Sequence, residues 1–148
     1  KRFQYNPNTS SRIIERYTES SSAANLRIST YYDYLSLADK VKDNLSAAGL
    51  HIDVEVLTGN LPNNFTLLLA QMTLSKDPDQ YFFWHSTQKG TNITSYKNVR
   101  VDKALEDGRA TFNLENRKEI YTDFQRVLVE DMPAYFLYYP YSYTIKRK

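Results

Sequence analysis

The fold is decided by residues 26–57, LRISTYYDYLSLADKVKDNLSAAGLHIDVEVL. Residues 26–32 alternate apolar and polar side chains, which is the period of a half-buried strand. Residues 36–48 then place apolar side chains on one helical face, and Gly49 follows as a residue suited to the left-handed conformation in which helices often end. Residues 51–57 return to the strand period. Because one helix between two strands favours parallel pairing, this stretch predicts an α/β fold.

The segments around this unit add further helices and one more strand. A Ser-rich linker is expected over 18–25, and a third, buried strand over 65–74. The tyrosine-rich segment 134–148, interrupted by Pro140, is expected to be an edge strand or a bend. The residues expected to begin helices are Asn6, Ser36, Asp77, Asn98 and Asn113. Residues 1–148 together read as a single α/β lobe.

Composition excludes several classes of protein. The chain has 148 residues, no cysteine, two histidines and four glycines. Disulfide scaffolds, zinc–thiolate sites and cysteine nucleophiles are therefore excluded, and neither a P-loop nor a dinucleotide-binding turn can be written. No window approaches the roughly 20 apolar residues of a membrane span. We expect no cofactor and no metal ion.

A small hydrolase is one alternative that the sequence leaves open. It would use His85 as a base with Asp77 or Asp79, and Ser86 follows directly after the histidine. No GxSxG elbow is present, and an Asp-Pro-Asp sequence is adequately explained by helix capping. We therefore expect a protein that is not an enzyme.

A second alternative is an interaction module at the C-terminus. Six aromatic side chains precede three basic residues, as in proteins that bind single-stranded nucleic acid: Tyr135, Phe136, Tyr138, Tyr139, Tyr141, Tyr143, Lys146, Arg147 and Lys148. Alternating aromatics also favour a strand that packs on helices, and three terminal charges make a weak phosphate track. The net charge of +2 is mild as well, so we expect no nucleic-acid partner.

Several motifs resemble those of a known family. The segment FQYNPNTSSRII at 3–14 looks like a short helix of the form Y-x-Y-(D/N)-P-x-x-A-x-x-L-L, and 26–57 resembles the family's strand–helix–strand unit. The later motifs are DPDQYFFWHS at 77–86, TNITSYKNVRVD at 91–102 and ENRKEIYTDFQRVLVEDMPAYFLYY at 115–139. Their order and spacing resemble the C-terminal lobe of extracytoplasmic solute-binding proteins of ATP-binding-cassette importers, in the family that binds oligopeptides, dipeptides and nickel complexes.

The resemblance implies one lobe of a type II-like periplasmic binding protein, with a parallel or mixed sheet flanked by helices. In that family two lobes close by a hinge around a peptide or another small solute and deliver it to permease subunits. It implies an extracytoplasmic location, with contact to the membrane only through an upstream anchor or the transporter. Because family members are several times longer, it also implies that an N-terminal lobe of the same protein is a partner.

Two departures from the family pattern affect the expected site. Peptide binders of the family often carry a Trp at the end of the third strand and, three residues later, an Asp that pairs with the ligand's ammonium group. Here those positions hold Gln71 and Leu74, and a leucine cannot pair with an ammonium group. In addition, residues 59–64 replace a helix that usually separates the second and third strands.

Ligands of α/β sheets bind beyond the carboxyl ends of the strands, and these ends, with the polar loop around Asn92 as a further candidate place, select the candidate residues. Amide and hydroxyl groups would bind a peptide, and flat rings would pack on it. The candidate ligand-binding residues are Gln71, Thr73, Asn92, Tyr31, Tyr32 and Trp84. The alternative for Trp84 and His85 is that they pack within the fold. Asn98 and Asp102 are expected to cap a helix and Tyr96 to anchor its loop.

Overall fold

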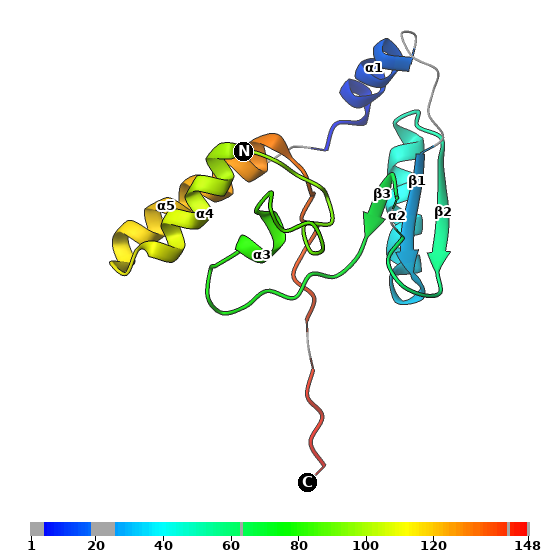
Figure 1. Cartoon of the computed structure of the whole chain (residues 1–148). Helices are drawn as coiled ribbons and strands as arrows, with labels where there is room; N and C mark the ends of the chain where they lie inside the picture. The colour runs from blue at the N-terminus through cyan, green and yellow to red at the C-terminus, as the bar shows by residue number, and fades with distance from the viewer. Residues whose placement is uncertain (1–4, 19–25, 63, 142, 148) are drawn as a thin grey trace. The chain divides into compact units, whose positions relative to one another are not determined.

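The computed structural model describes residues 5–18, 26–62, 64–141 and 143–147 (Figure 1). The chain divides into two compact units, Lys1–Thr73 and Leu74–Lys148, and the single lobe expected over 1–148 stays a prediction. The linker expected over 18–25 lies outside the described residues, apart from Thr18. None of the helices in the described part of the chain is long and apolar enough to cross a membrane.

The first unit contains a three-stranded parallel sheet. Strand β1 (Leu26–Tyr31) lies in the middle, between β2 (Ile52–Leu57) and β3 (Leu67–Leu69). Both outer strands run parallel to β1, and Ile28 of β1 lies opposite Val54 and Leu67. Helix α2 (Leu35–Ala47) connects β1 to β2. The α/β fold and the parallel strand–helix–strand unit are therefore confirmed.

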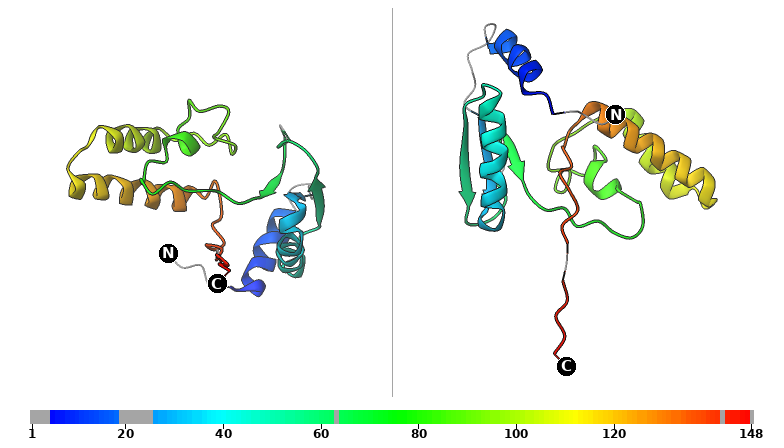
Figure 2. Two further views of the ribbon diagram at one scale, coloured as in Figure 1. Left: turned by 90° about the horizontal axis from the view of Figure 1, so that it is seen from below. Right: turned by 180° about the vertical axis from the view of Figure 1, so that it is seen from behind.

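Helix α2 lies against one face of this sheet (Figure 2). The core between them consists of Ile28, Ala38 and Ile52, each at most 5% exposed. Partly buried side chains surround this core: Leu26, Val41, Leu45, Leu50, Val54 and Leu69. The apolar periods of 26–32, 36–48 and 51–57 converge on this core, which explains why the sequence predicts the unit well.

The predicted end of α2 at Gly49 agrees with the structure, whereas its predicted start at Ser36 does not. After the helix, Gly49 has φ of +99°, a conformation that side chains with a Cβ rarely adopt. At the start, the capping residue expected at Ser36 was wrong. A short 3₁₀ turn, η1 (Tyr32–Tyr34), runs directly into α2, and the backbone N–H of Leu35 donates to the carbonyl of Tyr32. Tyr34, which directly precedes α2, makes no capping hydrogen bond with its side chain.

Two further elements of this unit were predicted with different success. Helix α1 (Pro7–Thr18) begins as expected, since the Asn6 side chain accepts a hydrogen bond of 3.1 Å from the backbone of Thr9. Strand β3 has three residues, so the buried strand expected over 65–74 was wrong in extent. Leu67 is 39% exposed, so this strand is not buried, and among the described strands β3 pairs with β1 alone.

The second unit contains a helical hairpin formed by α4 (Val99–Ala110) and α5 (Leu114–Asp131), which lie side by side in both figures. Asn98 and Asn113 cap these helices as predicted, each accepting hydrogen bonds from backbone N–H groups of the first turn. The buried side chains of the hairpin are Val101, Leu105, Tyr121, Phe124, Val127 and Leu128. The hairpin thus provides the apolar core of this unit.

Two expectations for this unit were not met. Helix α3 (Tyr81–Trp84) begins after Asp77, so Asp77 is not its cap. Asp77 instead accepts a hydrogen bond from the backbone of Asp79, which in turn accepts one from Tyr81, in successive side-chain turns. The described residues of 134–147 form no strand, because no strand in the described part of the chain pairs with them.

Candidate functional site

The three strands of the sheet end at one edge, because they are parallel. The last residues of β1, β2 and β3 are Tyr31, Leu57 and Leu69. Parallel α/β sheets bind ligands at this carboxyl edge. The segments that follow the strands there, 32–35, 58–61 and 70–73, therefore define the candidate site of the first unit.

Two hydrogen bonds fix the geometry of this edge. The Thr30 hydroxyl, which is fully buried, donates to the carbonyl of Leu69 over 2.9 Å and holds the end of β3 against β1. Beyond the strands, the Tyr34 hydroxyl donates to the side-chain oxygen of Gln71 over 2.9 Å. This bond occupies the Gln71 oxygen and leaves its amide nitrogen free to donate to a ligand. The sequence pattern did not select Tyr34, although it belongs to the same YYDY sequence as Tyr31 and Tyr32.

Four of the predicted ligand-binding residues lie on this edge. Tyr31 is half-buried at the end of β1, and Tyr32 is 77% exposed in the turn that follows. Gln71 and Thr73 are exposed in the segment after β3. The structure thus brings these polar and aromatic side chains to one edge of the sheet, and their contact with a ligand stays a prediction.

The other two predicted residues, Trp84 and Asn92, are buried within the second unit. Trp84 is 5% exposed and meets the rings of Tyr96 and Phe136 edge-on, at centroid distances of 6.4 and 6.3 Å. The Asn92 side chain donates to the Tyr96 carbonyl over 2.8 Å and accepts from the Tyr96 backbone N–H over 3.2 Å. Both side chains hold the loop before α4 in place, so in this unit they have a packing role. Their contact with a ligand stays a prediction.

Tyr96 anchors this loop, as expected from the sequence. Its hydroxyl donates to the Asp131 carboxylate over 2.6 Å, and Asn98 donates to the same oxygen over 2.7 Å. These two bonds lower the pKa of Asp131. Burial, followed by the bond to Asp131, raises the pKa of Tyr96.

His85 is buried and held by three neighbours. Its ring stacks on Tyr81 at a centroid distance of 4.0 Å. Nδ1 lies 2.8 Å from the Thr87 hydroxyl, and Nε2 lies 3.3 Å from the Glu106 carboxylate. With 4% of its surface exposed, this histidine is placed to stabilise the turn after α3.

The groups that a hydrolase would need are engaged elsewhere. Asp77 forms an ion pair of 2.7 Å with Arg117, whose bond holds the pKa of Asp77 below its usual value of 3.8. Asp79 forms one of 2.7 Å with Arg109. The Ser86 backbone and hydroxyl both donate to Asp102, over 2.9 and 2.5 Å. Asp102 therefore caps this loop, and its expected role as a cap of its own helix was wrong.

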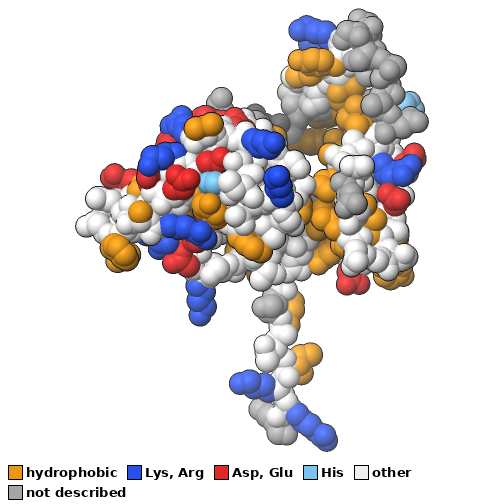
Figure 3. Space-filling view, in the orientation of Figure 1, with side chains coloured by type: hydrophobic (Ala, Val, Ile, Leu, Met, Phe, Trp, Pro, Cys, Tyr) orange, Lys and Arg blue, Asp and Glu red, His pale blue; other side chains and the backbone are white. Residues whose placement is uncertain are grey.

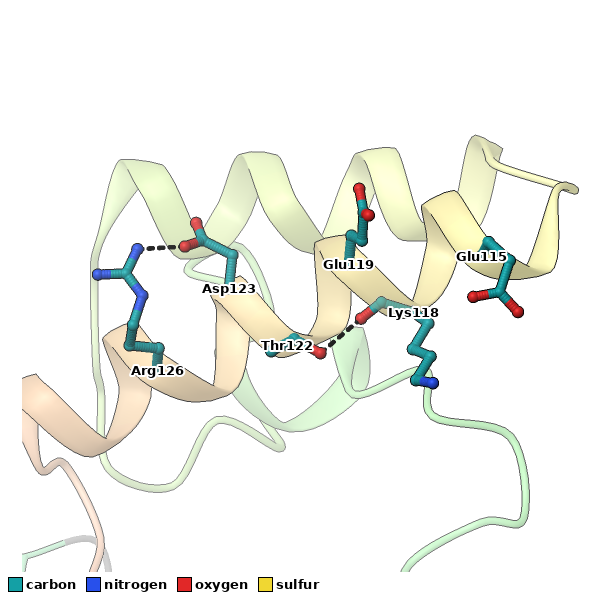
Figure 4. A pocket seen from close by; sticks show the side chains of 6 residues that line it. All are labelled: Glu115, Lys118, Glu119, Thr122, Asp123 and Arg126. Atoms are coloured by element: carbon teal, nitrogen blue, oxygen red, sulfur yellow. Dashed lines mark hydrogen bonds and ion pairs between the residues drawn. The ribbon is translucent and has the colours of Figure 1, made fainter. Parts of the chain in front are cut away.

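The outer surface of the hairpin carries charges that pair with one another. Figure 3 shows basic and acidic side chains interspersed over α4 and α5. Asp123 accepts from Arg126 and, over 2.9 Å, from Arg100, and these bonds lower the pKa of Asp123. A shallow hollow on α5 is lined by charged and polar side chains, among which Asp123 and Arg126 form an ion pair (Figure 4). Its lining residues are Glu115, Lys118, Glu119, Thr122, Asp123 and Arg126. Within the described part of the chain, no group of three or more His, Cys, Asp or Glu could hold a metal ion.

Comparison with known proteins finds a curated relative that is an oligopeptide-binding protein. No family model matches the sequence. The oligopeptide-binding protein AppA of Bacillus subtilis is 31% identical over 114 residues, which are 70% of this chain and 21% of AppA. The chain therefore spans about a fifth of the length of this curated relative.

Two solved structures share the fold. NikZ from Campylobacter jejuni, in complex with Ni(L-His), has a TM-score of 0.77 and 24% identity, over 90% of this chain and 32% of NikZ. AppA from Bacillus subtilis, in complex with a nonapeptide, has a TM-score of 0.77 and 20% identity, over 90% of this chain and 31% of AppA. The arrangement of strands and helices described above is thus found in both proteins.

Proposed function

We propose that this chain, which is related in sequence and fold to the oligopeptide- and nickel-binding family of extracytoplasmic solute-binding proteins, is part of the solute-binding component of an ATP-binding-cassette importer. The observation that carries the proposal is the 31% identity with an oligopeptide-binding protein across 70% of the chain. The relatives are binding proteins, and we accordingly propose a role without covalent chemistry.

In this role the chain supplies one wall of a cleft for a peptide or a related small solute. The carboxyl edge of the sheet provides amide and hydroxyl groups from Gln71 and Thr73 and flat rings from Tyr31 and Tyr32. The opposite wall comes from an N-terminal lobe outside this sequence, and hinge closure brings the two walls together around the solute. The closed protein then docks on a permease at the outer face of the membrane.

A lobe that offers one wall leaves much of the solute in water, so the 148-residue chain should bind peptide weakly. We would titrate the isotope-labelled chain with the pentapeptide Ala-Ala-Lys-Ala-Ala and follow backbone amide shifts by NMR. The expected result is millimolar binding, with shifts concentrated in residues 31–34 and 70–73.

Two variants separate a binding edge from unspecific contact. Gln71→Ala should weaken binding, because it removes an amide donor from the edge. Gln125→Ala, which truncates an exposed glutamine of the same kind on α5, should leave binding unchanged. An absence of shift changes at the edge, or an equal effect of both variants, would contradict the proposal.

A further inference from the structure

The carboxyl edge of the sheet has an unusual distribution of charge. The segments that follow β1, β2 and β3 are 32–35 (YDYL), 58–61 (TGNL) and 70–73 (AQMT). One residue in these three segments is charged, and it is Asp33. No lysine, arginine or histidine stands in them to neutralise it, so the candidate site carries a single negative charge.

The Asp33 carboxylate is available to a ligand. The residue is exposed in the turn η1, and its side chain has no hydrogen bond or ion pair with any described residue. Its neighbours in the turn are Tyr32, which is 77% exposed, and Tyr34, which the Gln71 side chain holds in place. An unpaired carboxylate is thus surrounded in sequence by aromatic rings on an edge that is fixed by hydrogen bonds.

A structural role alone does not account for this arrangement. Asp33 precedes α2, where a negative charge interacts favourably with the helix dipole. Its carboxylate does not cap the helix, because the backbone of the 3₁₀ turn runs directly into α2. The dipole also explains neither the tyrosines on both sides of Asp33 nor the absence of basic residues from the three segments.

We propose that the candidate site binds a cationic group of the solute, an ammonium or a guanidinium, with Asp33 as its counter-ion. Tyrosine rings attract cations through the electron-rich ring face, and a carboxylate binds them by charge-assisted hydrogen bonds. The two kinds of group together favour a cation over a neutral or anionic group. This inference rests on the proposed function and defines the chemical class of its solute.

The test compares two pentapeptides that differ in positive charge. Ala-Ala-Lys-Ala-Ala has a free ammonium and a lysine, whereas N-acetyl-Ala-Ala-Gln-Ala-Ala has no cation. By NMR titration, the chain should bind the cationic peptide about threefold to tenfold more tightly. Added salt should reduce this preference, because Asp33 is exposed.

Two variants with the same change in charge identify the counter-ion. Asp33→Asn should reduce the preference to near one without weakening binding of the acetylated peptide. Asp53→Asn is the matched control, since Asp53 is exposed near the opposite, amino end of β2, and it should keep the preference. Unchanged dispersion of the amide spectrum would show that both variants fold.

The titrations distinguish a failure of the cation inference from a failure of the proposed function. Equal binding of both peptides, or a preference that survives Asp33→Asn, would overturn the cation inference and leave a solute-binding edge intact. Binding of neither peptide would overturn the proposed function and this inference with it.

Discussion

Replacement of Gly108 by alanine tests how tightly the helical hairpin is packed. Gly108 is buried in α4, where it faces Tyr121 of α5. A Cβ atom at this position would lie 2.7 Å from Cζ, 2.9 Å from Oη and 3.0 Å from Cε2 of the tyrosine ring. These distances are shorter than ordinary contacts between heavy atoms, so the ring or the helix would have to move.

The ring has little freedom to move away. Tyr121 is 4% exposed and meets Phe124 edge-on at a centroid distance of 6.3 Å. Arg117 lies over the same ring and donates to the Gly108 carbonyl over 2.9 Å, so a shift would disturb this bond too. Overpacking of this severity costs about 3 kcal/mol. Alanine recovers about 1 kcal/mol of helix propensity, which leaves a net loss of about 2 kcal/mol.

Urea denaturation followed by tryptophan fluorescence measures this loss. The chain has one tryptophan, Trp84, which is buried in the same unit as the hairpin, so its emission reports the unfolding of that unit. Gly90→Ala is the matched control, because no heavy atom lies within 4 Å of its added Cβ and its free energy of unfolding should change by less than about 0.5 kcal/mol. A Gly108→Ala variant as stable as the unmodified chain, or more stable, would refute the packing argument.

Three further predictions use the same assay. Asp102→Ala should lower the free energy of unfolding by about 1–2 kcal/mol, because two Ser86 donors lose their acceptor; an unchanged value would contradict this role. Tyr121→Phe should be neutral or stabilising by up to about 1 kcal/mol, since the buried hydroxyl has no partner among the described residues; a clear loss would reveal a bond it makes. The hydrogen bond from Arg117 lowers the pKa of Asp77, so the ion pair stabilises the fold above the unfolded pKa near 4 and this contribution is lost as the pH falls. Asp77→Asn removes the titrating carboxylate and should therefore lose less stability than the unmodified chain between about pH 5 and pH 2. Identical acid profiles of the two proteins would argue against this role.

Local patterns of the sequence predicted most of the fold. The strand–helix–strand unit of 26–57 could be predicted because its apolar periods all face one core, formed by Ile28, Ala38 and Ile52. The caps at Asn98 and Asn113 could be predicted because capping depends on the first turn of the helix alone. The length of β3 could not, since it depends on how many residues of 65–74 find a partner on β1.

The candidate site was less predictable, because it depends on contacts between residues distant in sequence. The rule for parallel sheets selected Tyr31, Tyr32, Gln71 and Thr73 correctly as residues of one edge. It could not reveal that Tyr34 binds Gln71, a contact across 37 positions. The arginine partners of Asp77 and Asp79 were equally hidden, because they lie on the hairpin, 30 or more positions away.

Some acidic residues are already paired with arginines, and this pairing affects which carboxylate can bind a cationic solute. On the hairpin, a cation that approaches Asp123 has to compete with Arg100 and Arg126, both of which already bind this carboxylate. Asp77 is likewise occupied by Arg117 through two hydrogen bonds. Asp33 has no such partner among the described residues, so a cationic solute would gain its charge-assisted bonds without displacing an internal one. No internal bond must be broken at Asp33, which favours it over Asp77 and Asp123 as the counter-ion of a bound cation.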